Sequence, residues 1–126
     1  MKLIDRVLYI DRLKRIKGTP DIKIITGIRR CGKSKLLQAF INYIETTEDN
    51  ANVIFIDFTR LEFEPLREYH ALYQYVQERH RHDKTNYLMI DEVQMCPNFE
   101  MAVNSLHSSE QYDIYLTGSN AFLLNR

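Results

Sequence analysis

The sequence lacks several features that define whole classes of protein. Its 17 lysine and arginine residues are balanced by 17 aspartate and glutamate residues, so no net charge draws the chain to nucleic acid or to an anionic membrane. No apolar run approaches the roughly 18 residues of a membrane span, and charges interrupt residues 1–18 too often for a signal peptide. These absences predict a cytoplasmic location and no membrane partner, and they do not indicate a nucleic-acid partner.

Cysteine is also scarce. The two cysteines, Cys31 and Cys96, fit no metal-ligand spacing, and a reducing compartment disfavours a disulfide between them. Cys31 lies beside a lysine and a predicted helix start, which could make its thiol reactive, but we interpret it as a variable loop position. We read the four histidines as surface or core-edge residues rather than metal ligands: His70, His80, His82 and His107.

A length of 126 residues with ordinary charged and apolar fractions predicts one folded domain with a substantial core. Within it, residues 1–20 form an N-terminal segment in which apolar residues recur at helical spacing among basic ones. This pattern predicts an amphipathic helix over 3–17, whose basic face we interpret as solvated. Residues 21–126 form the core of the domain.

Only four glycines occur, and two of them lie in the stretch Gly27–Ser34, GIRRCGKS. The stretch matches the phosphate-binding loop G-x-x-x-x-G-K-[ST] between a β-branched run and a helical pattern, which is the setting that the motif requires. Lys33 would place a charge on the β- and γ-phosphates, and the Ser34 hydroxyl would ligate Mg²⁺. The helix that begins near Lys33 would aim its positive end at the same anion. The predicted nucleotide contacts are Gly27, Ile28, Arg29, Arg30, Cys31, Gly32, Lys33, Ser34 and Lys35.

Strand and helix patterns alternate along the rest of the chain, which predicts an α/β fold with a parallel sheet and helices on both faces. The run at 53–58 is continuously apolar, as expected of a strand buried on both faces. Asn98 is a candidate N-cap. The expected strands are 22–26, 53–58, 87–92 and 113–117, the expected helices are 33–44, 64–82 and 99–106, and the polar stretch 45–52 is expected to be a loop.

Two acidic residues follow the apolar run YLMI, and they fit the second part of a phosphate-binding site. Asp91 lies where a carboxylate would hold Mg²⁺ beside Ser34. Glu92, the next residue, is placed to orient and deprotonate an attacking water. Strands often end in acidic residues that only cap a turn, and the upstream phosphate-binding loop favours the catalytic reading.

The fourth strand leads into TGSN, residues 117–120. Ligands of such sheets bind beyond the carboxyl ends of the strands. Asn120 or Thr117 is therefore expected to hydrogen-bond the γ-phosphate or the attacking water. The competing role is a helix N-cap formed by Ser119 or Asn120.

Three stretches together resemble a known family: GIRRCGKS at 27–34, YLMIDEVQ at 87–94 and the segment 99–124. They resemble the AAA-type ATPase domain of the prokaryotic predicted ATP-binding proteins that carry an uncharacterised C-terminal domain. The resemblance covers nearly the whole chain and implies a P-loop NTPase three-layer sandwich, with Walker A at 27–34, Walker B at Asp91 and Glu92, and a sensor-type position within 117–120. It also implies that the Walker A strand neighbours the TGSN strand, with the Walker B strand beyond it.

Two departures from the family pattern change these expectations. Lys35 stands where the family usually has threonine. Because Ser34 is the expected Mg²⁺ ligand, this difference would affect only the fine tuning of the site. The chain also ends where family members continue, so we expect an N-terminal fragment whose sandwich is incomplete at its C-terminal edge. An arginine finger would then come from the absent C-terminal region of the same protein or from a neighbouring copy in a homo-oligomer. Arg126 is terminal, and Arg29 and Arg30 are expected to face the loop or a partner.

The leading hypothesis is a domain that binds Mg²⁺ and ATP and hydrolyses the β–γ bond, with Lys33, Glu92 and Asn120 as catalytic residues and Ser34 and Asp91 as metal ligands. Family knowledge disfavours GTP, because no N-K-x-D guanine signature occurs. The rival from another class is a nucleotide-dependent switch or interaction module with little turnover. A small-molecule kinase is a weaker third hypothesis.

Overall fold

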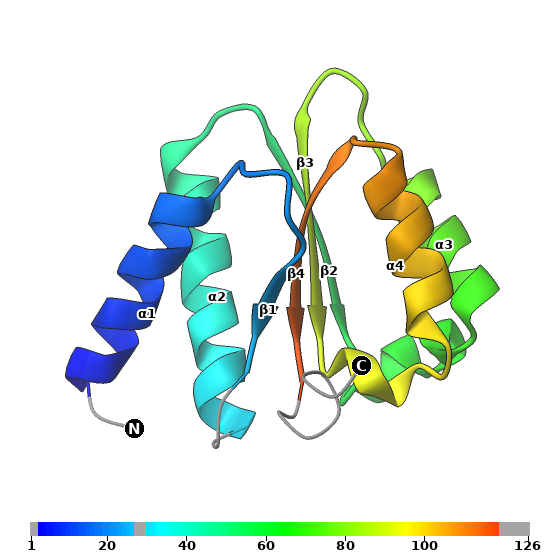
Figure 1. The fold of residues 1–126 in the computed structure, drawn as a ribbon, viewed down its shortest axis with the longest axis horizontal. Coiled ribbons are helices and arrows are strands. Elements are labelled where there is room, and N and C mark those ends of the chain that lie inside the picture. Colours follow the sequence, from blue (N-terminus) through cyan, green and yellow to red (C-terminus); the bar gives the residue numbers. More distant parts are fainter. Residues whose placement is uncertain (1–2, 27–29, 119–126) are drawn as a thin grey trace.

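The structure is a computed structural model that describes residues 3–26 and 30–118, and of residues 3–9, 30 and 31 it describes only the backbone. Its centre is a four-stranded sheet in the order β1-β4-β3-β2, with every neighbouring pair parallel (Figure 1). The order agrees with the one that the family resemblance implies. The strands are β1 (Lys23–Ile25), β2 (Ala51–Asp57), β3 (Thr85–Asp91) and β4 (Tyr112–Thr117).

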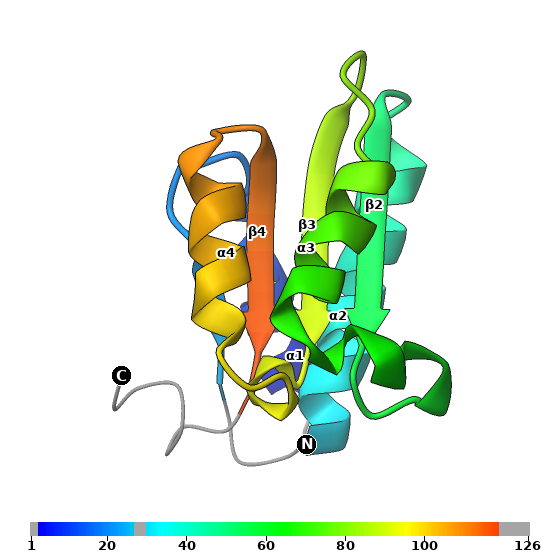
Figure 2. The ribbon, with the colours of Figure 1, turned by 90° about the vertical axis from the view of Figure 1, so that its right-hand side faces the viewer.

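Helices cover both faces of this sheet, as the alternating pattern predicts. Figure 2 shows α3 and α4 on one face, with α1 and α2 behind the sheet on the other. The α-helices are α1 (Leu3–Ile16), α2 (Arg30–Thr47), α3 (Tyr69–Glu78) and α4 (Phe99–Ser108), and two short 3₁₀ helices are η1 (Leu61–Arg67) and η2 (Val93–Met95). The three-layer α/β sandwich is therefore confirmed.

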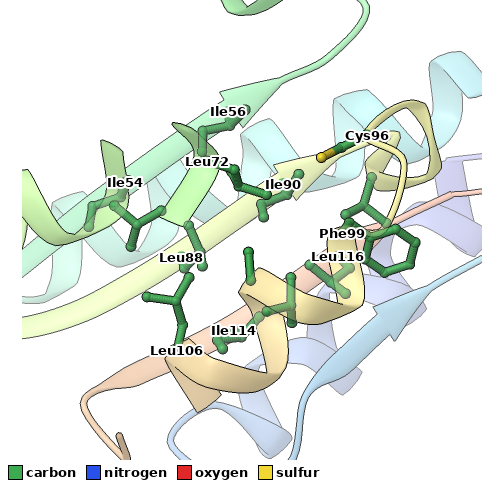
Figure 3. Packing of buried hydrophobic residues seen from close by; sticks show 14 of the residues in the cluster. Ile54, Ile56, Leu72, Leu88, Ile90, Cys96, Phe99, Leu106, Ile114 and Leu116 are labelled. Carbon is green, nitrogen blue, oxygen red and sulfur yellow. The ribbon is translucent and has the colours of Figure 1, made fainter. Parts of the chain in front are cut away.

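Each face of the sheet has its own apolar core, because successive side chains of a strand point to opposite faces. In β3, Leu88 and Ile90 pack under α3 and α4, whereas Tyr87 and Met89 pack under α1 and α2. Figure 3 shows the first core, where Leu106 and other helix residues meet the strands. The second core is built around residues from α1, α2 and two strands: Leu13, Leu36, Leu37, Phe40, Ile41, Ile44, Tyr87, Met89 and Tyr115.

The prediction of a strand buried on both faces at 53–58 is wrong. In the described sheet β2 pairs with β3 alone and lies at the edge. Ile54 and Ile56 are buried, whereas Val53 and Phe55 are only half-buried against the second core. Continuous burial is found instead in β3, from Asn86 to Asp91, and in β4, from Asp113 to Thr117, because each has a partner strand on both sides.

The single helix expected over 64–82 is also wrong. Residues 61–67 form the 3₁₀ helix η1, which contains Pro65, and α3 begins only at Tyr69. Glu68 between them is extended (φ −98°, ψ 125°), and its carboxylate accepts hydrogen bonds from the backbone N–H groups of His70 and Ala71. A side chain that satisfies the free N–H groups of a helix start defines a new N-terminus there.

Other boundaries differ by a few residues. The second helix, α2, begins at Arg30 rather than near Lys33 and runs to Thr47, so part of the expected loop over 45–52 is helical and Ala51–Asn52 already belong to β2. Asn98 does precede α4, but it is left-handed (φ 60°), and among the described residues its side chain makes no capping hydrogen bond. Among the described residues, no helix is long and apolar enough to cross a membrane.

Candidate functional site at the carboxyl edge of the sheet

All four parallel strands end on the same side of the sheet, close to the start of α2 (Figure 1). We call this side the carboxyl edge, and the side where the strands begin the amino edge. In a parallel sheet this edge is where ligands bind. β3 ends at Asp91 and β4 ends at Thr117, while Lys33 and Ser34 lie in the first turns of α2. The topology thus brings together residues that are up to 84 positions apart in the sequence, from Lys33 to Thr117.

The carboxylate of Asp91 is held by two hydroxyl groups. Ser34 Oγ donates a hydrogen bond to Oδ2 at 2.7 Å, and Thr117 Oγ1 donates a short one to Oδ1. Asp91 is 1% exposed and Thr117 is fully buried, whereas Ser34 is half-buried. The predicted pair of metal ligands, Ser34 and Asp91, therefore lies in direct contact.

Glu92 immediately follows β3 and turns the chain sharply. Its backbone is left-handed (φ 57°, ψ 55°), a conformation that non-glycine residues rarely adopt. Its N–H donates to Thr117 Oγ1 at 2.9 Å, and its Oε1 accepts from Gln94 Nε2 at 2.6 Å. Glu92 is 3% exposed, and its Oε2 lies 3.8 Å from Lys33 Nζ.

Lys33 is buried, at 6% exposure, although it carries a charge. Its ammonium donates to the Gly118 carbonyl at 2.6 Å, just beyond the end of β4, in addition to its contact with Glu92. Burial of a lysine is costly unless anionic or carbonyl acceptors surround it. The start of α2, where Lys33 lies, is also the positive end of the helix dipole, which adds to the attraction for an anion.

The electrostatics of this edge act most strongly on Asp91. Burial raises its pKa above the ordinary value, while the hydrogen bonds from Thr117 and Ser34 oppose the shift and the charges of Asp57 and Glu92 add to it. Such a perturbed carboxyl group in an edge where ligands bind marks a functional-site candidate.

The structure brings together most of the predicted site residues whose side chains it describes. Lys33, Ser34, Asp91, Glu92 and Thr117 form one connected group. Lys35, by contrast, is exposed. Gly32 is buried in the first turn of α2. The remaining predictions fall on Gly27, Ile28, Arg29 and Asn120, which lie outside the described residues, and on Arg30 and Cys31, of which only the backbone is described.

Three parts of the site were not predicted. Asp57, at the end of β2, lies directly opposite Asp91 in the strand register. Gln94 holds the Glu92 carboxylate, and the Gly118 carbonyl accepts from Lys33. The sequence did carry one signal for Asp57. This aspartate interrupts the apolar run 53–58, just as Asp91 directly follows the apolar run YLMI. A backbone carbonyl leaves no such signal in the sequence.

The sheet order, the helix that starts at the carboxyl edge and the contact between its serine and the Asp91 carboxylate define an α/β sandwich of the P-loop NTPase type. The chain belongs to the AAA domain family, which matches it over residues 19–126. This confirms the AAA-type resemblance read from the motifs. The family is an ATPase-type, nucleotide-binding one.

A curated relative adds to the comparison. The chain is 34% identical over 125 residues to an uncharacterized protein of Haemophilus influenzae. The match covers 98% of this chain and 31% of the relative, so the chain spans about a third of that protein's length. No solved structure matches the chain.

Proposed function

We propose that this domain binds ATP with Mg²⁺ at the carboxyl edge of the sheet and hydrolyses its β–γ bond. The observation that supports this most strongly is the connected group of polar side chains there. A lysine and a serine from α2, the Asp91 carboxylate at the end of β3 and the carboxylate of the next residue, Glu92, lie within hydrogen-bonding or ion-pair distance of one another or of a shared partner. An ATP hydrolase needs a cation for the phosphates, oxygen ligands for the metal and a base for water, and these residues match that set.

The donor set suits a magnesium ion. Mg²⁺ prefers hard oxygen ligands, usually one or two protein groups together with phosphate oxygens and water. Ser34 Oγ and Asp91 Oδ2 are such ligands and lie 2.7 Å apart. When bound, the ion would neutralise part of the charge on the phosphates. The half-buried Ser34 can turn its hydroxyl lone pairs toward a cation, because among the described residues its side chain would give up a single hydrogen bond, the one to Asp91.

Lys33 and the start of α2 would hold the phosphates. In the structure the ammonium donates to the neutral Gly118 carbonyl. A phosphate oxygen carries charge and is a stronger acceptor than a carbonyl, so it would replace that partner. The first N–H groups of a helix have no acceptor within the helix, and they would donate to the same phosphates.

Glu92 would act as the general base. Its carboxylate takes a proton from water while the water oxygen forms a bond to the γ-phosphorus. The bond from that phosphorus to the β–γ bridging oxygen breaks, and ADP and inorganic phosphate leave. Gln94 and the left-handed backbone hold the Glu92 carboxylate at this edge, 3.8 Å from Lys33.

One contact favours a second candidate function, a nucleotide-dependent switch with little turnover. The Lys33 ammonium is bonded to Gly118, where the chain leaves β4. If an ATP phosphate replaces this carbonyl as the acceptor of Lys33, binding alone releases Gly118 from the contact, and no hydrolysis is needed.

Glu92→Gln separates the two functions. For an ATP hydrolase, we expect phosphate release to fall by about 10²- to 10⁴-fold while ATP binding, measured by calorimetry, is retained. Glu110→Gln is the matched control, because Glu110 shares the left-handed backbone but lies at the opposite edge of the sheet. Unchanged phosphate release in Glu92→Gln would rule out Glu92 as the base, and binding without release in the wild type would favour the switch.

A further inference from the structure

Thr117 is the last residue of β4 and is fully buried. Its hydroxyl group makes two hydrogen bonds at once. It donates its proton to Asp91 Oδ1 and accepts the Glu92 backbone N–H at 2.9 Å. Thr117 therefore joins the end of one strand to two consecutive residues at the end of its neighbour.

These two bonds decide what the hydroxyl group can bind. A threonine hydroxyl has one proton and two acceptor lone pairs. The proton goes to Asp91 and one lone pair to Glu92, so only an acceptor lone pair remains. The oxygens of a γ-phosphate are themselves acceptors, and they need a donor. Thr117 can donate to a phosphate only by breaking its bond to Asp91.

The same bonds fix the two proposed functional carboxylates in different ways. Asp91 receives Thr117 on Oδ1 and Ser34 on Oδ2, so the plane of its carboxylate is set by two hydroxyl groups. For Glu92 the bond goes to the backbone, at the residue with the unfavourable positive φ. A hydrogen bond from that N–H stabilises the turn that directs the Glu92 side chain.

We propose that Thr117 is a positioning residue for magnesium: it orients Asp91 toward the ion and holds the turn at Glu92, and it does not contact the γ-phosphate. This differs from the sensor-type contact that the sequence suggested for Thr117. The proposal rests on the proposed function, since it assigns Thr117 a part in the same site. Ser34 can exchange its partner for a ligand, whereas the buried Thr117 keeps Asp91 in place.

The test compares ATP binding in excess Mg²⁺ and in EDTA, by calorimetry, for the wild type, Thr117→Val and Thr117→Ser. Valine keeps the shape and removes the hydroxyl group, whereas serine keeps it. We expect valine to weaken binding about tenfold in Mg²⁺ and to leave binding in EDTA unchanged, because only the metal depends on Asp91. Serine should remain close to the wild type in both conditions. If the valine variant does not fold, Thr117→Ala replaces it.

The remaining outcomes contradict the proposal in distinguishable ways. Equal weakening with and without Mg²⁺ would assign Thr117 to the phosphate contact or to the fold alone. If Thr117→Val does not weaken ATP binding, or if Thr117→Ser binds ATP as weakly as Thr117→Val, the hydroxyl group has no positioning role. If the wild type binds ATP equally well in both conditions, the proposed Mg²⁺ site and the proposed role of Thr117 are both contradicted, whereas the proposed ATP site is supported. If it binds no ATP in either, the proposed function itself fails.

Discussion

The two edges of the sheet each bury a lysine beside a carboxylate, but they hold it differently. At the amino edge, Lys23 Nζ lies 2.6 Å from Asp113 Oδ1, and both side chains are almost fully buried. Asp113 Oδ2 also accepts from the Tyr115 hydroxyl at 2.8 Å and from the Gly18 N–H at 2.9 Å. At the carboxyl edge, by contrast, Lys33 lies 3.8 Å from Glu92 and donates to a neutral carbonyl.

The comparison distinguishes a structural ion pair from a candidate binding site. At the amino edge, close hydrogen bonds tie the connection after α1 to β1 and β4, and the charges neutralise each other. At the carboxyl edge the lysine is farther from its carboxylate, the backbone of Glu92 is strained, and burial raises the pKa of Asp91. Buried ionisable groups with perturbed pKa values cluster at functional sites.

Removing Asp113 should damage the fold most. Asp113→Ala leaves the Lys23 ammonium buried without its carboxylate, and breaking a buried pair in this way costs about 3–5 kcal/mol of unfolding free energy. Urea denaturation measures the loss. Glu48→Gln is the control, because the pair of Glu48 with Lys17 is only partly buried and should contribute about 1 kcal/mol or less. Equal losses in the two variants would contradict the structural role assigned to the amino edge.

Asp91→Asn should stabilise the protein at neutral pH. Burial raises the native pKa of Asp91, so the folded state binds more protons than the unfolded one between the ordinary carboxyl pKa, about 4, and the raised value. Stability therefore falls as pH rises through this window, and the cost is complete above it. The gain of Asp91→Asn should be present at pH 8 and disappear near pH 4. It should be smaller than the loss in Asp113→Ala.

Urea denaturation at the two pH values measures this difference, with Asp83→Asn as the control because Asp83 is exposed. An equal gain at both pH values would show that ionisation of Asp91 does not cause it. A larger gain at pH 4 would mean that folding lowers the pKa of Asp91.

The smallest effect concerns two glutamates with the same backbone. Glu92 and Glu110 both have φ 57°, at opposite edges of the sheet. Glu110→Gly should stabilise the fold by about 1 kcal/mol or less, because glycine adopts this conformation without strain and the gain is offset by greater freedom when unfolded. ATP hydrolysis should be unchanged in Glu110→Gly and lost in Glu92→Gly. If both variants hydrolyse ATP, Glu92 is not the general base.

Periodicity and short motifs predicted much of the fold. The alternation of strand and helix was enough for the parallel sandwich, and the resemblance was enough for its strand order. Neither the alternation nor the resemblance showed that β2 is an outer strand, because an apolar run such as 53–58 looks the same whether the strand has one neighbour or two. The break at Glu68 was missed because helical spacing continues across it, while Pro65 and a capping carboxylate act on the backbone.

The site was predictable where a side chain belongs to a motif. Lys33, Ser34, Asp91 and Glu92 follow from short, local patterns, and the fold brings them together. The direction of the Thr117 hydroxyl group depends on the register of two strands and on the turn at Glu92, which no local pattern encodes. The same is true of the Gly118 carbonyl, since every residue has one.

The central claim is that the carboxyl edge binds a nucleotide through Lys33. Calorimetric titration of ATP with Mg²⁺ into the wild type, Lys33→Ala and Lys84→Ala tests it most directly. Lys84 is an exposed lysine at the opposite edge, just before β3. We expect the wild type and Lys84→Ala to bind alike and folded Lys33→Ala to lose measurable binding. Equal ATP binding by the wild type and both variants would contradict the claim, as would a folded wild type that binds no ATP.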